Sequence, residues 1–414
     1  MKAIPWARGE GRALALSFGY FALLLASYYL IRPLRDAAAA ASGADTIRYL
    51  ASVVFVVMLL IVPAFGWLIA RIPRARLLPW LYLFFAANLA AFGVLFQSAP
   101  EAPWSGRVFY VWTTVFNMFV VSVFWSFMAD VWREQQARRL FGVIAAGGSL
   151  GGLIGPWLAH ALVARIGAAG IAWLAALLLI ACVPAIRALT RGVEADRAAA
   201  VVRLDEPLGG AILAGLTGLA KSPFLLGVAA LVALGALLGM FVYIELARYA
   251  AAAYAGAAAR TEFFAARDLW VNAASALLQL LVVGRLSSRF GVRATLTGTA
   301  LIATGVFVGL GLAPALAGLA AASVVLRTTE LGLAKPSRDM LYTVIDAENR
   351  YKTKNLIDTV VYRGADATSG WVHAGLVAAG ATLTTLAGIS VALGLALALI
   401  AWSVGSGYRR RGGG

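Results

Sequence analysis

Long apolar stretches alternate with short polar connections along almost the whole chain. Most of these stretches hold about 20 residues, which is the length that an α-helix needs to cross a bilayer. The pattern predicts about twelve membrane-spanning helices, so the expected fold class is an all-α polytopic membrane protein. The predicted spans are 13–31, 47–70, 77–98, 107–129, 141–164, 168–189, 223–247, 262–284, 293–312, 315–334, 354–378 and 382–403.

The composition supports the same class. Hydrophobic residues make up 62% of the chain and charged residues only 13%, whereas charged residues are about 25% of a soluble domain. The net charge of +16 would suit a nucleic-acid partner, but a nucleic-acid-binding domain gathers its basic residues in one patch or stripe. Here they are spread over many connections, so we expect no nucleic-acid partner.

The basic residues alternate between the two sides of the predicted membrane. Most lie in the N-terminal segment, in every second connection, in the central segment and in the tail, and the opposite connections hold few. By the positive-inside rule both termini are cytoplasmic, and an even number of helices requires that the termini share one side. We expect a protein integral to a membrane, with a bacterial inner membrane as its location and the lipid bilayer as a partner.

The central segment, 190–222, is the longest interval without an apolar span, and it carries mixed charges. We interpret it as a cytoplasmic linker between an N-terminal six-helix lobe, 1–189, and a C-terminal six-helix lobe, 223–414. The linker ends in a near match to the phosphate-binding pattern G-x-x-x-x-G-K-[ST]. Because Ala220 replaces the second glycine and no strand precedes the motif, no ATPase site is predicted.

Cysteine and histidine are rare. The chain has one cysteine, Cys182, and two histidines, His160 and His373. A single cysteine excludes a disulfide within the chain, and the sequence offers no convincing metal cluster. No nucleophile and base of a membrane enzyme can be recognised either, so the sequence predicts no cofactor and no enzymatic activity.

The predicted span at 354–378 carries Asp358, Arg363 and Asp366. A charge at mid-membrane costs about 2.5–3.5 kcal/mol on insertion scales, so three in one span require an aqueous cavity or partners. Arg363 lies three residues before Asp366 and can pair with it on a helix. Polar residues also recur at helical spacing, in a stripe of Asn355, Thr359, Tyr362, Asp366 and Ser369. The span is therefore either part of a solute pathway or the place of a buried Arg–Asp brace.

Other predicted spans carry charges in or near their ends. The charged residues are Arg32, Arg35 and Asp36 after span 1, Glu245 and Arg248 in span 7, Arg267 and Asp268 in span 8, and Arg327 and Glu330 in span 10. Each group either faces a cavity or forms a salt bridge or an interfacial anchor. Arg327 and Glu330 are one turn apart and lie deeper in their span than the charges near span ends do, which favours the cavity for them.

The two predicted halves share a weak repeat. Gly66-Trp-Leu-Ile-Ala-Arg71 and Gly284-Arg-Leu-Ser-Ser-Arg289 both have the form G-x-L-x-x-R, and each follows the second span of its half. The repeat resembles the signature loop of the major facilitator superfamily, although Ala70 and Ser288 replace the family's Asp. The resemblance implies two six-helix lobes and a conformational role for these loops. Span 5 adds Gly147, Gly151 and Gly155, at a spacing that lets helices approach closely.

A narrower resemblance covers about a third of the chain. Tyr28-Tyr-Leu-Ile-Arg32-Pro-Leu-Arg35-Asp36 and Phe116-Asn117 through Trp125 to Asp130 are similar to the nucleotide (ATP/ADP) exchange transporters, and more closely to their short bacterial relatives. The resemblance implies that Arg32, Arg35 and Asp36 take part in binding nucleotide phosphates. Asn117, in the second similar stretch, is a further candidate ligand. Trp125 is expected either to stack on a ring of the solute or to pack in the core.

Together these patterns predict a secondary transporter that moves a small anionic or zwitterionic solute by alternating access, with nucleotide-like exchange as one form. Arginine forks suit anionic groups, and carboxylates would balance them or carry protons as the coupling ion. The predicted substrate ligands are Arg32, Arg35, Asn117, Trp125, Arg327, Tyr362 and Arg363, and the predicted charge-balancing residues are Asp36, Glu245, Glu330, Asp358 and Asp366. The alternative is a permease-like sensor or assembly partner without transport.

Overall fold

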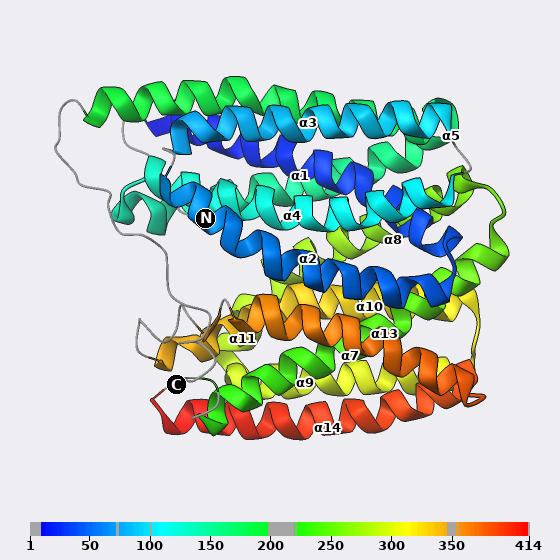
Figure 1. Cartoon of the computed structure of the whole chain (residues 1–414). Coiled ribbons are helices and arrows are strands. Elements are labelled where there is room, and N and C mark those ends of the chain that lie inside the picture. The colour runs from blue at the N-terminus through cyan, green and yellow to red at the C-terminus, as the bar shows by residue number, and fades with distance from the viewer. Residues whose placement is uncertain are drawn as a thin grey trace. The chain divides into compact units, whose positions relative to one another are not determined.

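The computed structural model of the protein describes residues 10–71, 74–99, 102–197, 219, 222–345, 353–354 and 356–412. Within these ranges the chain forms helices joined by short connections, and no strand occurs in them. The prediction of an all-α polytopic protein is confirmed (Figure 1). Most of the predicted linker, 198–218 and 220–221, lies outside the described residues.

The helices of the first half match the predicted spans, with two differences. They are α1 (Glu10–Ala41), α2 (Ala44–Arg71), α3 (Arg74–Ser98), α4 (Pro103–Val131) and α5 (Glu134–Arg197). α1 continues ten residues past the predicted end at Ile31, through Pro33, and so includes the charged residues that follow. α5 contains two predicted spans that break at Gly167, whose φ of 66° lies in the left-handed region open to glycine.

The second half contains several π-helical turns among its helices. Its elements are α7 (Pro223–Ala253), α8 (Ala257–Leu278), η1 (Gln279–Val283), α9 (Gly284–Leu312), α10 (Leu316–Thr329), η2 (Glu330–Ala334), α11 (Lys335–Leu341), η3 (Tyr342–Val344), η4 (Ile357–Val361), α13 (Tyr362–Ala378) and α14 (Leu383–Arg410). The π-helical turns are η1, η2 and η4, and two of them begin at or include an acidic residue, Glu330 and Asp358. Single π-helical turns inside helices are often found at functional sites.

Two compact units group the described helices. Unit 1 lies within Met1–Ala38, Val62–Leu208 and Gly256–Leu269, and unit 2 lies within Ala39–Ile61, Gly209–Ala255 and Trp270–Gly414. α2 and α8 are thus each divided between the units, while every other long helix belongs wholly or almost wholly to one of them. The six-helix lobes predicted at 1–189 and 223–414 remain a prediction.

The cores of the two units differ in kind. In unit 1, α3 lies beside α5 (Figure 1), and rings of α1, α3 and α4 pack edge to face, as Tyr20 does on Tyr82 and on Phe124. In unit 2, α9 lies beside α14, and the core is a mainly aliphatic cluster that includes Val228, Leu296 and Val404. Both arrangements bury apolar side chains within a unit while leaving other apolar side chains on its outer surface, as a lipid environment requires.

Among the described residues, eight helices are long and apolar enough to cross a membrane, and one of them, Arg139–Arg191, covers two predicted spans. The predicted spans 47–70, 262–284 and 354–378 are not among these eight helices, and two of them, 262–284 and 354–378, carry several charged residues. Charged residues inside a membrane span are usually functional, so functional residues are expected in these two spans.

The repeated motif lies at helix ends. Gly66 and Arg71 fall in the last turns of α2, and Gly284 and Arg289 fall in the first turns of α9, so both copies are mainly helical where a loop was expected. α9 then breaks at Gly291, which has a φ of 74°. The conformational role of the motif stays a prediction.

Candidate functional site

The end of α1 and the beginning of α8 bring five charged residues together in unit 1. Arg32, Arg35 and Asp36 come from α1, and Arg267 and Asp268 come from α8. Because α1 continues past Ile31 as a helix, the three residues of α1 are held inside the unit and not in a connection. The sequence placed Arg32, Arg35 and Asp36 in the site, and the structure adds Arg267 and Asp268 to them.

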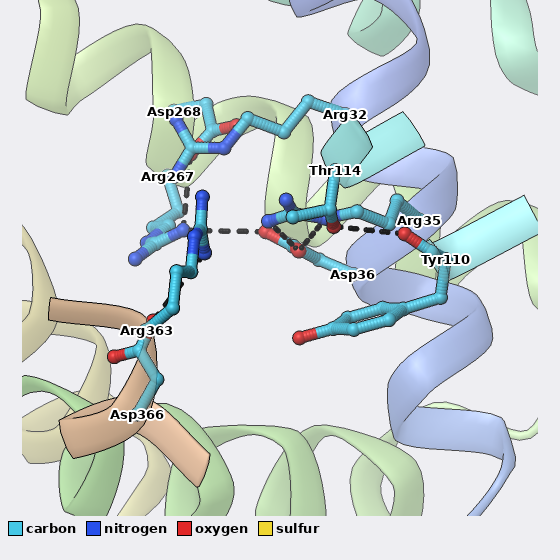
Figure 2. Close-up of polar contacts among 9 residues, drawn as sticks. All are labelled: Arg32, Arg35, Asp36, Tyr110, Thr114, Arg267, Asp268, Arg363 and Asp366. Atoms are coloured by element: carbon cyan, nitrogen blue, oxygen red, sulfur yellow. Dashed lines mark hydrogen bonds and ion pairs between the residues drawn. The ribbon is translucent and has the colours of Figure 1, made fainter. Parts of the chain in front are cut away.

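These side chains form a chain of alternating charge, which Figure 2 shows. Arg35 Nη2 lies 2.6 Å from Asp36 Oδ1, and the other oxygen of Asp36, Oδ2, lies 3.5 Å from Arg267 Nη1. Arg267 Nη1 also donates to Asp268 Oδ1 at 3.0 Å. Asp268 Oδ2 in turn lies 3.5 Å from Arg32 Nε. The order is Arg35, Asp36, Arg267, Asp268 and Arg32, with an arginine at each end.

This alternating charge chain is deeply buried. The side chains of Asp36 and Asp268 have no exposed surface, and that of Arg35, the most exposed of the five, is 12% exposed. An unpaired charge at such depth costs several kcal/mol, so each carboxylate between two guanidinium groups lowers the cost of burying all three. The arrangement can serve as a brace, and its terminal arginines also present forks that fit a carboxylate or phosphate.

An aromatic ring lies near each of the two terminal arginines. The guanidinium of Arg35 lies 5.3 Å from the ring centre of Tyr110, and that of Arg32 lies 5.6 Å from the ring centre of Tyr29. Thr114 of α4, also drawn in Figure 2, donates its hydroxyl to the carbonyl oxygen of Tyr110. Rings and guanidinium planes of this kind suit a solute with both a charged and a flat part.

The remaining predicted ligands of unit 1 lie on α4. Asn117 is half-buried, one turn beyond Thr114. Trp125 packs against the rings of Phe21, Phe124 and Phe141, with ring centres 5.2–5.3 Å apart. The neighbours of Trp125 agree with the packing alternative that the sequence left open.

In unit 2 the predicted pair of Arg363 and Asp366 is formed. Arg363 Nη1 donates to Asp366 Oδ2 at 3.4 Å, and both side chains are partly exposed, at 23% and 19%. The guanidinium of Arg363 also lies 5.5 Å from the ring centre of Tyr362. Ser369 of the same stripe is buried and donates to the carbonyl oxygen of Ala365, whereas Asn355 lies outside the described residues.

Glu330 pairs with a residue that sequence reasoning missed. Its carboxylate accepts a hydrogen bond from Arg338 Nη1 at 3.1 Å, whereas Arg327 lies in the last turn of α10, before Glu330 begins η2. Arg338 comes from α11. In the sequence it belongs to a basic stretch at the end of a predicted span, so it was interpreted only as a marker of membrane orientation. Asp358 is exposed, in η4.

Glu245 of α7 also has a partner that was missed. His373 Nε2 lies 2.8 Å from Glu245 Oε1, and both side chains are buried. The other oxygen, Oε2, accepts from Arg248 Nε at 3.1 Å. A histidine inside a predicted span was the available signal, because polar residues there are rare and usually paired.

The residues do not suggest a metal centre. Within the described part of the chain, no group of three or more His, Cys, Asp or Glu side chains is arranged to hold a metal ion. The polar groups are instead Arg–carboxylate and His–carboxylate pairs. Such groups can bind and exchange charged partners.

Comparison with known proteins gives the family. A family model described as Major Facilitator Superfamily matches residues 13–337. No curated protein is similar enough in sequence to match the chain.

Several solved structures resemble it over nearly the full length. An auto-inhibited peptide transporter of the POT family has 14% identity and a TM-score of 0.60, with 97% of each chain covered. The nucleoside transporter NupG has 14% identity and a TM-score of 0.60, with 95% of this chain and 98% of that chain covered.

A bacterial homologue of the iron transporter ferroportin, in an inward-facing state, has 14% identity and a TM-score of 0.59, with 96% of each chain covered. At this identity the likeness shows the fold alone. The family model covers well over half of the chain, and the membrane-spanning helices agree with it. This chain belongs to the Major Facilitator Superfamily of membrane transporters.

Proposed function

We propose that this transporter moves a small anionic or zwitterionic solute by alternating access. The observation that carries the proposal is the alternating charge chain of unit 1, in which three arginines and two aspartates are buried within membrane-spanning helices. Charges at this depth are retained mainly where they have a role. Nucleotide-like exchange is one form of the proposed activity.

The proposed mechanism is an exchange of anions on the arginines. Without solute, Asp36 and Asp268 neutralise the guanidinium groups around them. A solute carboxylate or phosphate would take the place of an aspartate oxygen on Arg35 or Arg32, at the two ends of the charge chain. Replacing one anion by another changes the local charge less than adding an anion to an apolar site, so the cost of burying the solute falls.

Unit 2 supplies a second proposed contact. Arg363 is partly exposed and held by Asp366 and Tyr362, and it can exchange Asp366 for a solute anion in the same way. We propose that Asp366, Asp358, Glu330 and Glu245 balance charge or carry the coupling proton, and that Arg327, Asn117 and Trp125 complete the contacts with the solute. Two similar structures are named as peptide and nucleoside transporters, which agrees with a small organic solute.

The proposed setting is a bacterial inner membrane, with both termini cytoplasmic and six-helix lobes at 1–189 and 223–414 joined by the linker 190–222. The alternation of basic residues along the chain supports this orientation. In such a membrane the helices described above would place the charge chain of unit 1 away from the cytoplasmic ends of α1 and α4.

Thermal stability in detergent, measured against nucleotides, organic acids, amino acids and siderophore-like compounds, gives the first test. A true ligand raises the unfolding temperature because it binds the folded state only. We expect the stabilising compounds to be anions or zwitterions. Stabilisation by cations or neutral sugars alone would contradict the proposal.

Variants of Arg35 then test whether the stabilising compound binds at the charge chain. Arg35→Ala should remove the stabilisation, and Arg35→Lys should weaken it, because lysine keeps the charge but lacks the fork. Arg107→Lys is the matched control, since Arg107 is exposed on α4 of the same unit. Saturable uptake of the stabilising compound by proteoliposomes identifies a transporter. Binding without uptake would instead identify the sensor that the sequence left as an alternative.

A further inference from the structure

The outward face of α14, in unit 2, changes from apolar to basic along the helix. Leu395, Leu399, Trp402, Ser406 and Arg409 follow one another at steps of three and four residues, so they form one stripe, which we call the α14 stripe. Leu395 is 49% exposed, Leu399 73% and Trp402 50%, and Arg409 is exposed at the end of the stripe. Aliphatic side chains, an aromatic ring and a cation thus follow in the order in which a membrane passes from hydrocarbon to headgroups.

Arg293 of α9 adds a second cation beside the α14 stripe. Its guanidinium lies 3.8 Å from the ring centre of Trp402, a distance at which an arginine stacks on an indole ring. A Cβ atom added at Gly405 of α14 would lie 2.6 Å from the Cα of Arg293, so the absence of a side chain at Gly405 lets the two helices approach here. The fold therefore holds an arginine over the ring, where the apolar part of the stripe ends.

The cations at this end of α14 lack a countercharge. Within the described part of the chain, no carboxylate pairs with Arg293, Arg409 or Arg410. Arg411 differs from them, because its guanidinium lies 4.6 Å from the ring centre of Phe224, where the last turn of α14 lies beside the start of α7 (Figure 1). Arg293 and Arg409 are therefore available to an anion from outside the chain.

Helix dipoles and membrane orientation account for some of these arginines but not for Arg293. Basic residues in the last turn of a helix interact favourably with its dipole and mark the cytoplasmic side, which is sufficient for Arg409 and Arg410. Arg293 instead lies near the start of a helical segment, since α9 breaks at Gly291. The dipole disfavours a cation at that end. An anion beside Arg293 would compensate both the guanidinium and the positive end of the segment.

The length of the α14 stripe indicates which kind of anion fits. A helix rises by about 1.5 Å per residue, so Leu395 and Arg409 lie about 21 Å apart along α14. One leaflet, with its headgroups, is about 20–22 Å thick, which is half of a bilayer. A soluble anion would use only the basic end of the stripe. A phospholipid would use the whole stripe, because its acyl chain can lie along the exposed leucines while its headgroup reaches the arginines.

We propose that Arg293, Trp402 and Arg409 bind the headgroup of an anionic phospholipid whose acyl chain lies along Leu395 and Leu399. The two guanidinium groups bind the lipid phosphate, and the Trp402 ring contacts the lipid between headgroup and acyl chain. By the positive-inside rule the lipid belongs to the cytoplasmic leaflet. The site lies wholly within unit 2, and it depends neither on the charge chain of unit 1 nor on the solute proposed for it.

Native mass spectrometry of the delipidated protein in neutral detergent tests the site. The protein is titrated with dioleoyl phosphatidylglycerol and, in parallel, with dioleoyl phosphatidylcholine, which has the same acyl chains but no net charge. The first phosphatidylglycerol should bind about tenfold more tightly or better, because charge-assisted hydrogen bonds to the arginines favour a headgroup with net negative charge.

Two neighbouring arginines separate a site from general attraction. Arg409→Ala should weaken binding of the first phosphatidylglycerol by about tenfold or more, because Arg409 belongs to the α14 stripe. Arg410→Ala is the matched control, since Arg410 is equally exposed but lies on another face of the helix. Its loss should weaken binding by about fivefold at most, which is the general attraction of one arginine near an anionic surface.

Variants of Arg293 and Trp402 test the stacked pair. Arg293→Ala removes the second cation, and Trp402→Ala removes the ring on which it stacks, so each should weaken binding by about tenfold. Arg293→Lys should have a smaller effect than Arg293→Ala, because lysine keeps the charge but lacks the planar fork. The unfolding temperature without lipid shows whether each variant folds. Arg409→Ala changes an exposed side chain in the last turn of α14, so it tests the site even if the Arg293 variants do not fold.

Glycerol 3-phosphate separates a lipid site from a site for soluble anions, because it carries the phosphate without acyl chains. It should not displace phosphatidylglycerol at equal concentration. The proposal is overturned if glycerol 3-phosphate does displace the lipid, or if phosphatidylcholine binds equally well. It is also overturned if Arg409→Ala and Arg410→Ala weaken binding equally, which would indicate attraction to a positive surface without a site.

Discussion

Each aspartate of the charge chain in unit 1 lies between two arginines. Asp36 contacts Arg35 and Arg267, and Asp268 contacts Arg267 and Arg32. Removing one buried partner leaves the other charge uncompensated, whereas removing an exposed partner costs little because water takes its place. At the scale of single residues, stability and the proposed binding therefore involve the same few side chains, and variants have to separate the two.

Asp268→Asn should destabilise the protein by about 3–5 kcal/mol, because Arg32 and Arg267 both lose a buried countercharge. The measurement is the free energy of unfolding in detergent, from a denaturant titration. Glu262→Gln is the control on the same helix, since Glu262 is 47% exposed and its loss should cost about 0–1 kcal/mol. Equal effects of the two variants would show that the charge chain is solvated and not buried.

Arg363 and Asp366 allow binding to be separated from bracing. Arg363→Ala removes the ion pair between Arg363 and Asp366, so a loss of stability is expected. The double variant Arg363→Ala with Asp366→Ala removes both charges and should regain folding. If Arg363 is a ligand, the refolded double variant still fails to bind the stabilising solute in the thermal assay. If the double variant regains binding and uptake as well, Arg363 has only a structural role and is not part of the proposed site.

Helix crossings in this protein use glycine where backbones touch. On α5, a Cβ atom added at Gly151 would lie 2.8 Å from the backbone nitrogen of Ala26 on α1, and one at Gly155 would lie 2.7 Å from the carbonyl oxygen of Ala26. The predicted role of this glycine stripe in close packing is confirmed. At the scale of elements, α5 holds α1 in place, and α1 carries three of the five residues of the charge chain.

Gly151→Leu should therefore lower the stability of unit 1 by about 1–3 kcal/mol or more, because the added side chain has no space and forces α1 and α5 apart. Thermal unfolding followed by circular dichroism measures the effect. Gly142→Leu serves as the comparison on the same helix, since a Cβ atom there meets nothing within 4 Å. Similar melting of the two variants would argue against a close α1–α5 crossing.

At the scale of the whole molecule, the fold and the family are settled and the orientation is a prediction. The basic residues place the end of α2 and the start of α9 on the cytoplasmic side, where the repeated motif lies. The same rule predicts that the charge chain of unit 1 lies toward the opposite side. The orientation therefore decides toward which face of the membrane the charge chain lies.

Cysteines placed at Ala70 and Ser288, in a Cys182→Ala background, test this orientation. Both should react with an impermeant maleimide in inverted vesicles and stay unlabelled in right-side-out vesicles, because the positive-inside rule makes both cytoplasmic. Removal of Cys182 is needed so that the introduced thiol is the one that reacts. Labelling of either position from the non-cytoplasmic side would overturn the predicted topology.

The sequence by itself determined the structural features that depend on residues close to one another along the chain. Apolar length predicted the membrane-spanning helices, because a bilayer selects segments by local hydropathy. Helical spacing predicted the pair of Arg363 and Asp366, because three residues bring side chains to one face of a helix. The glycine spacing on α5 likewise predicted a close crossing, although not its partner.

Only the tertiary structure decided which distant charges meet. Asp36 and Arg267 lie 231 positions apart, and no local pattern in the sequence links them. The same contact explains why α1 continues past its predicted end. Arg32, Arg35 and Asp36 can be buried in a helix because α8 supplies their partners, Arg267 and Asp268. Glu245 and His373, which lie 128 positions apart, are joined for the same reason. A charged residue in a membrane span indicates that a partner is present, but the packing of the helices determines which residue that partner is.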